Sequence, residues 1–388
     1  MDRARRVLYV QYTNPAAYPP LEHSSGLLAD AGWEVRLLGA EVPGAEGLRL
    51  VARSRRRVRH LPVWPSGWPD KLRYVWFHVW VVLWALVWRP AWVYVSDPYA
   101  CAVGLLLTHV PGLKVVYHEH DAPPDTNTGP AGRVRQWARR RLAARAQLRV
   151  LPNEQRALHF RQAVASASPT VIVWNCPSRG EVAPPRAVAA GTPRPSGLRL
   201  LYHGSLVPAR LPASVLHALA RLPESVRLCV IGYQTLGHAT YRAELRTLSR
   251  QLGIAERVEF RAEMPHPQLL CESRTSDVGL ALMPAVTDDH NLRWMPGASN
   301  KPFDYLASGL ALLVSDLPGW RELFVEPGYA VACSAEDPTS VAAALAWLLE
   351  HPQEMRSMGE RGRRRVEWEW NYETQFAPVL DWLQTGPC

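Results

Sequence analysis

The chain shows one pattern twice: short apolar or β-branched runs alternate with longer stretches of helical character. Such alternation is typical of parallel sheets with crossover helices, whose strands are covered on both faces and are therefore almost continuously apolar. The pattern predicts an α/β protein with two tandem domains. The strand-like runs lie at 7–10, 33–38, 92–95, 114–117, 148–151 and 171–174, and then at 199–202, 226–231, 258–260, 278–282, 310–314 and 329–332.

The boundary between the two series is a segment rich in Pro, Gly and Ala, residues 175–197, in which no apolar period survives. A chain of 388 residues is also too long for one ordinary core and suits two domains. We expect an N-terminal domain at 1–180, a linker at 181–197, a second domain at 198–355, and a C-terminal helix at 356–388 that packs across both.

The formal net charge of +9 is carried almost wholly by arginine, with clusters at 53–59, 133–149 and 361–365. Such clusters attract phosphate groups, whether of nucleotides, lipids or nucleic acids. The six cysteines are scattered, with neither a C-x-x-C pair nor metal-ligand spacing, so we expect small core residues and no metal site. The first residues also lack the apolar core of a secretory signal, and we therefore expect a reducing, cytoplasmic location.

Residues 74–88 are apolar apart from His78, and Arg73 and Arg89 flank them. The run is shorter than the ~20 residues that cross a bilayer. Two interpretations stay open. A helix buried against a sheet is the simpler and the favoured one, whereas the tryptophans and arginines favour a helix at the membrane surface.

A second segment raises the same question, because no acidic residue lies between Asp125 and Glu154 while seven arginines do. A helix here would either meet anionic lipid headgroups or a phosphorylated acceptor, or lie solvated at the surface. Peripheral contact with an anionic membrane, at its inner face, is therefore one expectation.

Polar and small residues directly follow the first strand of the second domain, in the turn HGSLVPAR at 203–210, ahead of a helix expected at about 212–222. In open parallel sheets, ligands bind beyond the carboxyl ends of the strands, where backbone N–H groups are exposed. Gly204 and Ser205 let the backbone approach an anion, and Arg210 can pair with a phosphate. The turn is a candidate anion site.

The segment GASNKPFDYLASG predicts a helix that starts at the N-cap candidates Ser299 and Asn300 and stops at Gly309. Uncapped N–H groups at such a helix start can hold a diphosphate. Lys301 and Asp304 share one helix face with residues 305 and 308, so both can meet one ligand. A capped surface helix with an ordinary Lys and Asp pair fits this composition equally well.

The chain resembles glycosyltransferase family 4 over nearly its whole length. The resemblance lies in the two segments above, in the strand VRLCVIG, and above all in SNKPFDYLASGLALLVSDLPGWRELF. The resemblance implies the GT-B fold, in which two Rossmann-like domains face each other across a cleft. It also implies a hexosyltransferase-type enzyme that moves a sugar, with retention and without metal, from a nucleoside diphosphate to an acceptor hydroxyl. Cell-surface polysaccharide, glycolipid or natural-product glycosylation would be its setting. No cofactor is expected beyond the nucleotide sugar itself.

The resemblance also assigns roles on the donor side. By position, Asp304 would bind the ribose hydroxyls, Ser205 and Arg210 the diphosphate, and Lys301 the sugar and phosphates. Two positions depart from the family pattern: Pro296 replaces the first glutamate of E-x7-E, and Ser205 replaces the arginine of the G-R-L turn. The implied donor-binding residues are Gly204, Ser205, Ser299, Asn300 and Asp304, and the implied catalytic residues are His120, Arg210 and Lys301.

In the first domain, KVVYHEHDAPP at 114–124 resembles a strand end that carries a D-x-H-E-like motif in the family. His120 aligns with the family's histidine and Asp121 with its acidic residue. The loop at 13–26 would help to shape the acceptor site. A loop whose side chains only satisfy their own backbone is the alternative. The implied acceptor-side residues are His118, Glu119, Asp121, Tyr12 and Asn14.

Other functions remain open on the same scaffold, because a fold does not determine an activity. A nucleotide-sugar epimerase or a phosphorylase would act on the donor without this acceptor. A nucleic-acid-binding protein would use the arginine clusters, yet these are spread over both domains and no such motif occurs, so nucleic acid is not expected. A non-catalytic subunit would fit the absence of the first glutamate of E-x7-E, where this chain has Pro296. The expected partners are a nucleotide-sugar donor and an acceptor whose identity the sequence leaves open.

Overall fold

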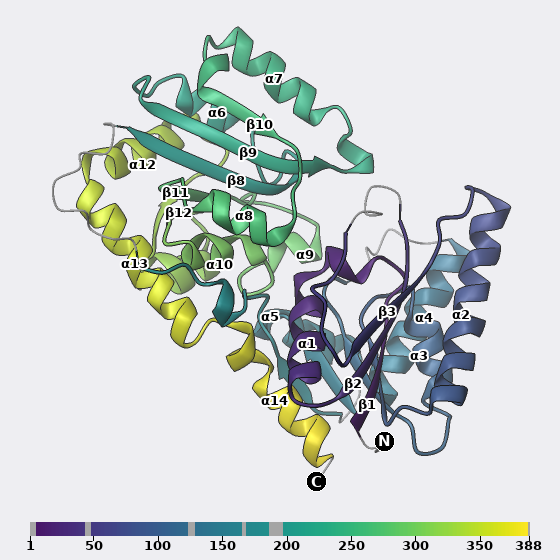
Figure 1. Cartoon of the computed structure of the whole chain (residues 1–388). Helices are drawn as coiled ribbons and strands as arrows, with labels where there is room; N and C mark the ends of the chain where they lie inside the picture. Colours follow the sequence, from purple (N-terminus) through teal and green to yellow (C-terminus); the bar gives the residue numbers. More distant parts are fainter. Residues whose placement is uncertain (1–4, 43–47, 123–128, 165–167, 186–196, 387–388) are drawn as a thin grey trace. The chain divides into compact units, whose positions relative to one another are not determined.

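The computed structural model describes residues 5–42, 48–122, 129–164, 168–185 and 197–386 (Figure 1). The chain forms two compact units, of which the first combines Met1–Asn175 with Tyr372–Cys388 and the second is Cys176–Asn371. Most of the predicted linker lies outside the described residues. The predicted C-terminal helix is two helices, the first in the second unit and the last in the first unit.

The first unit is built on a seven-stranded sheet, in which every strand pair is parallel and the order is β3-β2-β1-β4-β5-β6-β7. Six of these strands confirm the predicted ones within a few residues. The strands are β1 (Arg6–Val10), β2 (Glu34–Ala40), β3 (Arg56–Leu61), β4 (Trp92–Val95), β5 (Lys114–His118), β6 (Leu148–Leu151) and β7 (Thr170–Ile172).

Helices cover both faces of this sheet, and β1 shows why, since its successive side chains enter different cores. Val7 and Tyr9 pack with residues of α1 and α14, whereas Leu8 and Val10 pack with residues of α2, α3 and α4 (Figure 1). The helices of this unit are α1 (Pro19–Asp30), α2 (Trp68–Trp88), α3 (Cys101–Leu107), α4 (Pro130–Arg145), α5 (Glu154–Ala163), α14 (Tyr372–Thr385) and the one-turn η2 (Pro15–Ala17).

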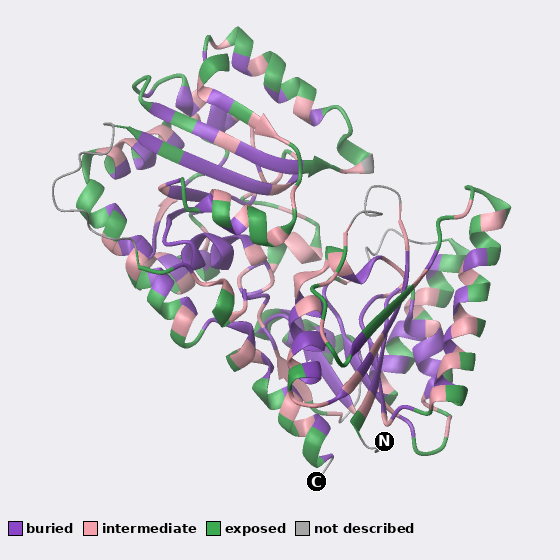
Figure 2. Ribbon diagram, viewed as in Figure 1, coloured by how far each residue is buried: buried purple, intermediate pink, exposed green. Residues whose placement is uncertain are grey.

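The apolar segment at 74–88 forms most of α2, which packs on the sheet with one side and leaves the other side exposed. One side of α2 packs on the sheet through Phe77, Val81 and Ala85, as the buried-helix interpretation expects. The opposite side is exposed along its length (Figure 2). The interpretation of a helix buried against the sheet therefore holds for the sheet-facing side of α2 only.

The second unit contains a six-stranded parallel sheet in the order β10-β9-β8-β11-β12-β13. All six strands match the predicted runs, and the predicted α/β class with two domains is confirmed. Its strands are β8 (Leu198–Leu206), β9 (Val226–Gln234), β10 (Val258–Arg261), β11 (Val278–Ala281), β12 (Ala311–Ser315) and β13 (Ala330–Cys333).

The helices of the second unit surround this sheet, and one of them, α10, is buried along almost its whole length (Figure 2). Gly279 on β11 permits this close packing, since a Cβ there would lie 2.2 Å from the Tyr305 ring. The helices are α6 (Ser214–Leu219), α7 (Tyr241–Gln251), α8 (His266–Ser273), α9 (His290–Arg293), α10 (Asn300–Ala307), α11 (Pro318–Trp320), α12 (Pro338–Glu350) and α13 (Pro352–Trp368), with the short turns η3 (Arg179–Glu181), η4 (Leu236–His238), η5 (Ala255–Arg257) and η6 (Arg321–Val325).

Candidate functional site

The carboxyl end of β8 lies against the first turn of α10, and Gly204 makes this approach possible. Gly204 has a φ of 111°, a conformation that other residues rarely adopt. A Cβ at this position would lie 2.8 Å from Cε and 3.1 Å from Nζ of Lys301. The predicted turn and the predicted helix start therefore meet at Gly204.

Lys301 carries a buried ammonium group, with only 6% of the residue exposed. Its Nζ lies 5.4 Å from the centre of the Tyr202 ring, and no described residue forms a hydrogen bond or an ion pair with it. Burial, and after it the charge of Arg210, hold the pKa of Lys301 well below its usual value. A buried cation without a counter-ion costs stability unless a ligand supplies the negative charge.

Arg210 is the second cation of this region and is half-buried. In the part of the chain that the structure describes, its guanidinium has no ion-pair partner either. Its charge acts on both Lys301 and Tyr202. Two unpaired cations within electrostatic reach of each other form a site suited to an anion that carries more than one charge.

The start of α10 adds backbone donors to this site. Ser299 occupies the N-cap, as predicted, with extended backbone, but its side chain accepts no capping hydrogen bond; Asn300 is the first helical residue rather than the cap. The positive end of the helix dipole is therefore not neutralised by a side chain. Ser205, on the neighbouring strand end, is also buried.

Asp304 lies one turn further along α10 and belongs to a buried network of histidines and carboxylates. Nε2 of His266 lies 3.3 Å from Oδ1 of Asp304, and Nδ1 of the same ring lies 3.2 Å from Glu181. Burial opposes a charge on His266, but Asp304 and Glu181 together raise its pKa to about 10. His203 lies on the other side, 3.7 Å from Oδ2 of Asp304, and burial holds its pKa well below the usual value.

These contacts decide against the surface-helix alternative. Lys301 and Asp304 are both buried, and they form no ion pair with each other. Residues 305 and 308 on the same face are buried as well. The segment at 299–309 is thus a core helix whose polar side chains lie at the carboxyl edge of the sheet.

In the first unit, two histidines at the carboxyl end of β5 lie against each other, with ring centres 3.9 Å apart. Nδ1 of His118 is 2.7 Å from the Tyr94 hydroxyl. Both ring nitrogens of His120 are buried without a hydrogen-bond partner. Burial, and after it the charge of Arg156, lower the pKa of His120 to about 3, so its ring is neutral at physiological pH.

The two acidic residues of the same motif are paired with arginines from helices. Arg139 of α4 donates from Nε and Nη2 to the carboxylate of Glu119, at 2.5 and 2.6 Å. Arg156 of α5 donates to Oδ1 of Asp121 at 3.0 Å and to the carbonyl of His120 at 2.6 Å. The alternative in which this loop only satisfies its own backbone is therefore wrong, because its partners are long-range.

The loop that follows β1 contains the other acceptor-side residues. Tyr12 packs against the rings of Tyr74 and Phe77, and its N–H donates to the carboxylate of Asp97. Burial raises the pKa of Asp97 to about 6. Sequence reasoning missed Asp97, although it directly follows a predicted strand, which is the same signal that singled out the β5 motif.

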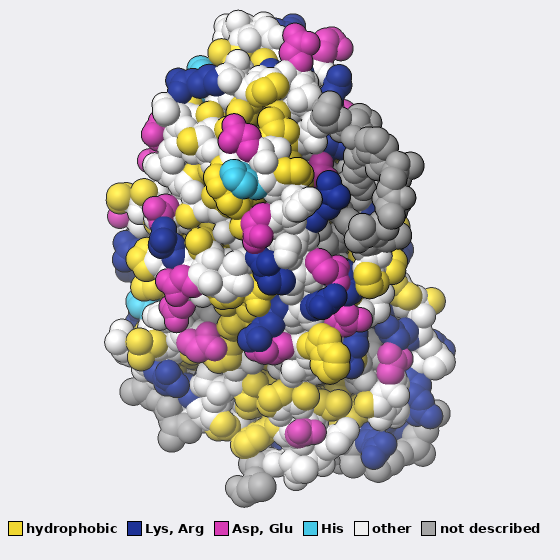
Figure 3. Space-filling view, turned by 90° about the vertical axis from the view of Figure 1, so that its left-hand side faces the viewer, with side chains coloured by type: hydrophobic (Ala, Val, Ile, Leu, Met, Phe, Trp, Pro, Cys, Tyr) yellow, Lys and Arg dark blue, Asp and Glu magenta, His cyan; other side chains and the backbone are white. Residues whose placement is uncertain are grey.

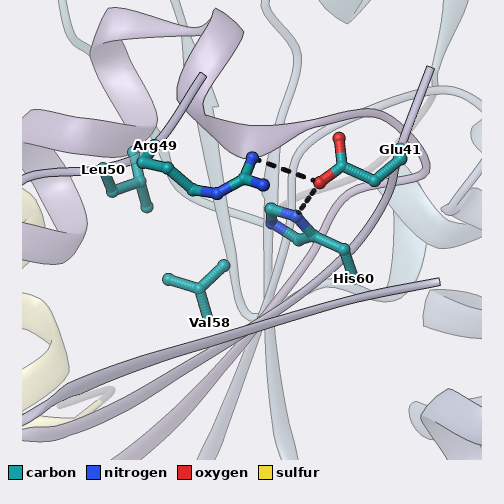
Figure 4. A pocket seen from close by; sticks show the side chains of 5 residues that line it. All are labelled: Glu41, Arg49, Leu50, Val58 and His60. Carbon is teal, nitrogen blue, oxygen red and sulfur yellow. Dashed lines mark hydrogen bonds and ion pairs between the residues drawn. The ribbon is translucent and has the colours of Figure 1, made fainter. Parts of the chain in front are cut away.

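A cavity of about 440 Å³ lies beside this loop, beyond the carboxyl end of β2 (Figure 4). Glu41 accepts from Nδ1 of His60 at 2.7 Å and from Arg49 at 3.4 Å, and Leu50 and Val58 supply apolar walls. Asn14 donates from Nδ2 to the other oxygen of Glu41 at 3.1 Å. One predicted acceptor-side residue is thus linked to the wall of a cavity that the sequence did not reveal.

The described ranges contain neither a candidate metal site nor a helix suited to span a membrane. No group of three or more His, Cys, Asp and Glu side chains is placed to hold a metal ion there. No helix of that part of the chain combines the length and the apolarity needed to cross a membrane.

Two family models match the sequence, one in each half. Residues 22–176 match the glycosyl transferase 4-like domain, and residues 210–381 match a glycosyl transferase-like family. The chain belongs to the family 4-like glycosyltransferases. The resemblance seen in its motifs is therefore confirmed, and its transferase class with it.

Solved structures show that this glycosyltransferase has the GT-B fold. Sucrose-phosphate synthase from Thermosynechococcus elongatus is similar with a TM-score of 0.74 at 16% identity, over 97% of this chain and 98% of that one. HepE of Anabaena, in a complex with UDP-glucose, gives 0.70 at 17% identity, over 98% and 99%. WaaG, a glycosyltransferase involved in lipopolysaccharide biosynthesis, gives 0.66 at 15%, over 98% and 100%. No curated protein matches the sequence itself.

Proposed function

We propose that the chain is a retaining transferase that moves a sugar from a nucleoside diphosphate to an acceptor hydroxyl. One observation carries the proposal: among the described residues, Lys301 and Arg210 are cations without counter-ions, next to the carboxyl end of β8 and the start of α10. A diphosphate supplies the negative charge that this arrangement lacks. The similar HepE structure was obtained with UDP-glucose, which supports a nucleotide-sugar donor.

The donor half would act by stabilising the charge that develops on the departing diphosphate. Lys301, Arg210 and the amides at the start of α10, around Ser299 and Asn300, are the donors for this charge. Because Lys301 is buried, its charge is little screened by water and its electrostatic effect is correspondingly strong. Gly204 and Ser205 would let the phosphates approach the backbone. These groups need no movement to meet the charge, which is the basis of preorganised catalysis.

Asp304 would accept hydrogen bonds from the ribose hydroxyls. His266 lies within hydrogen-bond distance of this carboxylate and would fix its orientation, and Glu181 holds His266 in turn. The ion pair with His266 uses Oδ1, so Oδ2, which His203 approaches only to 3.7 Å, is the oxygen that a ribose would use. We propose His266 as a positioning residue for the donor.

The acceptor would bind at the first unit. His120 offers a neutral ring with two unused nitrogens, which can donate one hydrogen bond and accept another from sugar hydroxyls. Glu119 and Asp121 position this motif through Arg139 and Arg156 rather than contacting substrate with free carboxylates. His118, Tyr12 and Asn14 would shape the surroundings, and the cavity at Glu41 is the candidate place for the acceptor.

The proposed reaction fits a reducing compartment. The five cysteines within the described residues form no disulfide, and three of them are buried. Cys271 is exposed, contrary to the expectation of core cysteines throughout. An exposed free thiol persists most readily where thiols are kept reduced. We therefore propose a cytoplasmic enzyme.

A donor screen tests the proposal directly. Wild-type protein is incubated with UDP-, GDP-, ADP- and dTDP-sugars and an acceptor library, and the anomeric configuration of the product is determined by NMR. We expect transfer with retention from at least one donor.

The Arg210→Ala variant should lose on the order of 3 kcal/mol of transition-state stabilisation. The control, Arg250→Ala on exposed α7, removes the same charge elsewhere. An Arg210→Ala protein as active as this control contradicts the assignment, and epimerised donor without transfer contradicts the function.

A further inference from the structure

The outer side of α2 carries an apolar stripe that no other part of the described chain covers. At about 3.6 residues per turn, its members fall within roughly 120° of the helix circumference. The helix is 21 residues long, so the stripe extends for about 30 Å. Such a stripe is normally buried. Its exposed residues are Trp68, Leu72, Val75, Trp76, Val79, Leu83, Leu86 and Val87.

Neighbouring helices extend the same apolar surface. α3 contacts both α2 and α4, and the three helices lie side by side on one face of the sheet (Figure 1). Leu106 of α3 and Val134 and Trp137 of α4 are exposed large apolar side chains. The apolar surface is therefore broader than a single helix, although its continuous part belongs to α2.

Three arginines form a basic cavity beside the carboxyl-terminal half of α2. Arg36, Arg57 and Arg59, with Val58, line about 340 Å³ at the outer edge of the sheet. Arg36 stacks over the rings of Trp84 and Trp88 on α2. None of the three arginines forms an ion pair with a described residue. We refer to this group as the arginine cavity.

Other arginines of the predicted clusters are paired with acidic residues. In the predicted cluster at 53–59, Arg53 pairs with Asp30, and Arg55 and Arg56 pair with glutamates. The cluster at 361–365 on α13 is neutralised by glutamates of the same helix and by its C-cap, Glu369. Figure 3 shows the result on that face, where basic and acidic side chains alternate.

The acidic residues nearest to the stripe and the cavity are already engaged. Asp70, in the first turn of α2, pairs with Arg73 at 3.1 Å. Glu34 lies within electrostatic reach of Arg36 and pairs with Arg55 at 3.4 Å. On α4, Arg139 is used by Glu119, while Arg140 and Arg141 are exposed. The surface as a whole is apolar with a basic margin.

We propose that this surface docks on an anionic lipid bilayer, with the α2 stripe at the level of the headgroups and the arginine cavity binding their phosphates. Tryptophan and basic side chains favour that depth. A second copy of the chain fits less well. A twofold interface brings identical patches together and would therefore bring no acidic partner to the unpaired arginines of either copy.

The test is flotation of the full chain with vesicles of phosphatidylcholine alone, or with about 30% phosphatidylglycerol. The stripe variant L83Q/L86Q exchanges two exposed leucines for residues of good helix propensity. Its matched control, L158Q/V286Q, makes similar changes at exposed positions elsewhere. The cavity variant R57Q/R59Q has the control R246Q/R250Q on α7, with the same loss of charge.

Wild-type protein and both controls should float with the anionic vesicles. The stripe variant should bind these vesicles about tenfold more weakly, and the cavity variant should lose most of the preference for phosphatidylglycerol. Equal flotation of stripe variant and control overturns the proposal. The proposal is also overturned if the stripe variant floats like wild type but differs from it in molar mass by light scattering. That result would mean that a second copy of the chain covers the stripe. Neither assay uses donor or acceptor, so the proposal can fail while glycosyl transfer stands.

Discussion

The carboxyl ends of β8 and β5 carry the candidate polar residues of their two sheets, yet their charges are arranged in opposite ways. In the second unit, Lys301 and Arg210 have no counter-ion among the described residues, and Asp304 is engaged by His266. In the first unit, each acid is matched by an arginine and His120 is neutral. The arrangement in the second unit has a positive charge that an anion could neutralise. In the first unit, the positive and negative charges already neutralise each other.

The difference suggests how one fold divides two tasks. A diphosphate brings negative charge, so its site gains by keeping cations unpaired at a cost in stability. An acceptor hydroxyl brings no charge, so its site needs neutral hydrogen-bonding groups on a rigid support.

The largest effect is expected on stability in the first unit. Arg139→Met leaves Glu119 buried without its partner, and breaking one side of a buried ion pair costs about 3–5 kcal/mol. Arg140→Met, one residue along and exposed, should change the free energy of unfolding by less than about 0.5 kcal/mol. Urea unfolding of both variants measures this. Equal stability of the two variants would show that the first unit is not balanced by this pair.

The second unit should respond in the opposite direction. Lys301→Met removes a buried, unpaired charge, so the free energy of unfolding should rise, by about 1–3 kcal/mol. The same change should lower kcat/KM by about 10²–10³, or ~3–4 kcal/mol. Thermal unfolding and initial-rate kinetics are the measurements, with Arg250→Met as control. A variant that is both less stable and fully active would reverse our interpretation of Lys301.

The two units should also differ in the sign of their pH dependence. The pKa of His120 is about 3 in the folded chain, below the unfolded value of about 6.5, so its contribution to stability falls as pH drops through that window. The pKa of His266 is about 10, so its contribution is complete below about 6.5 and falls as pH rises towards 10. Each slope is at most ~1.4 kcal/mol per pH unit.

Single substitutions separate the two slopes. His120→Phe should flatten the acid side of the profile of unfolding free energy against pH, and His266→Gln should flatten the alkaline side. Both profiles come from urea unfolding between pH 4 and 10 in steps of about one unit. If either variant retains the wild-type slope on its own side, the assigned protonation state of that histidine is incorrect.

The smallest effect is expected at Asp304. Asp304→Asn keeps the shape but weakens hydrogen bonds to the ribose, so KM for the donor should rise about tenfold with little change in kcat. With wild-type protein, a donor that lacks the 2′- and 3′-hydroxyls should show the same tenfold rise in KM. With the Asp304→Asn variant, removing these hydroxyls should raise KM no further. Additive losses would place the ribose away from Asp304.

Most of the fold could be predicted from the sequence, and the exception has a physical cause. Twelve strands appear as apolar runs because helices cover both faces of a parallel sheet. β3, RRVRHL, was missed because an edge strand with one open side can carry charged side chains, which hide its strand pattern.

The candidate site could be predicted only in part. The turn at Gly204 and the helix start at Ser299 follow from local rules for strand ends and caps. The partners of Asp304 do not, because His266 and Glu181 lie 38 and 123 positions away in the sequence and no local pattern marks them. The same holds for Arg139. Its sequence context is typical of a solvated basic helix, and its partner Glu119 lies 20 positions away.

The central claim is that the unpaired cations around Gly204 bind a diphosphate. Isothermal titration of UDP, GDP, ADP and dTDP, and of the four nucleosides, into wild type, Arg210→Ala, Lys301→Met and the control Arg250→Ala tests it most directly. We predict that at least one nucleoside diphosphate binds wild type and the control about 100-fold more tightly than either site variant. The matching nucleoside should bind all four proteins alike. A diphosphate that binds the site variants as tightly as wild type would contradict the account.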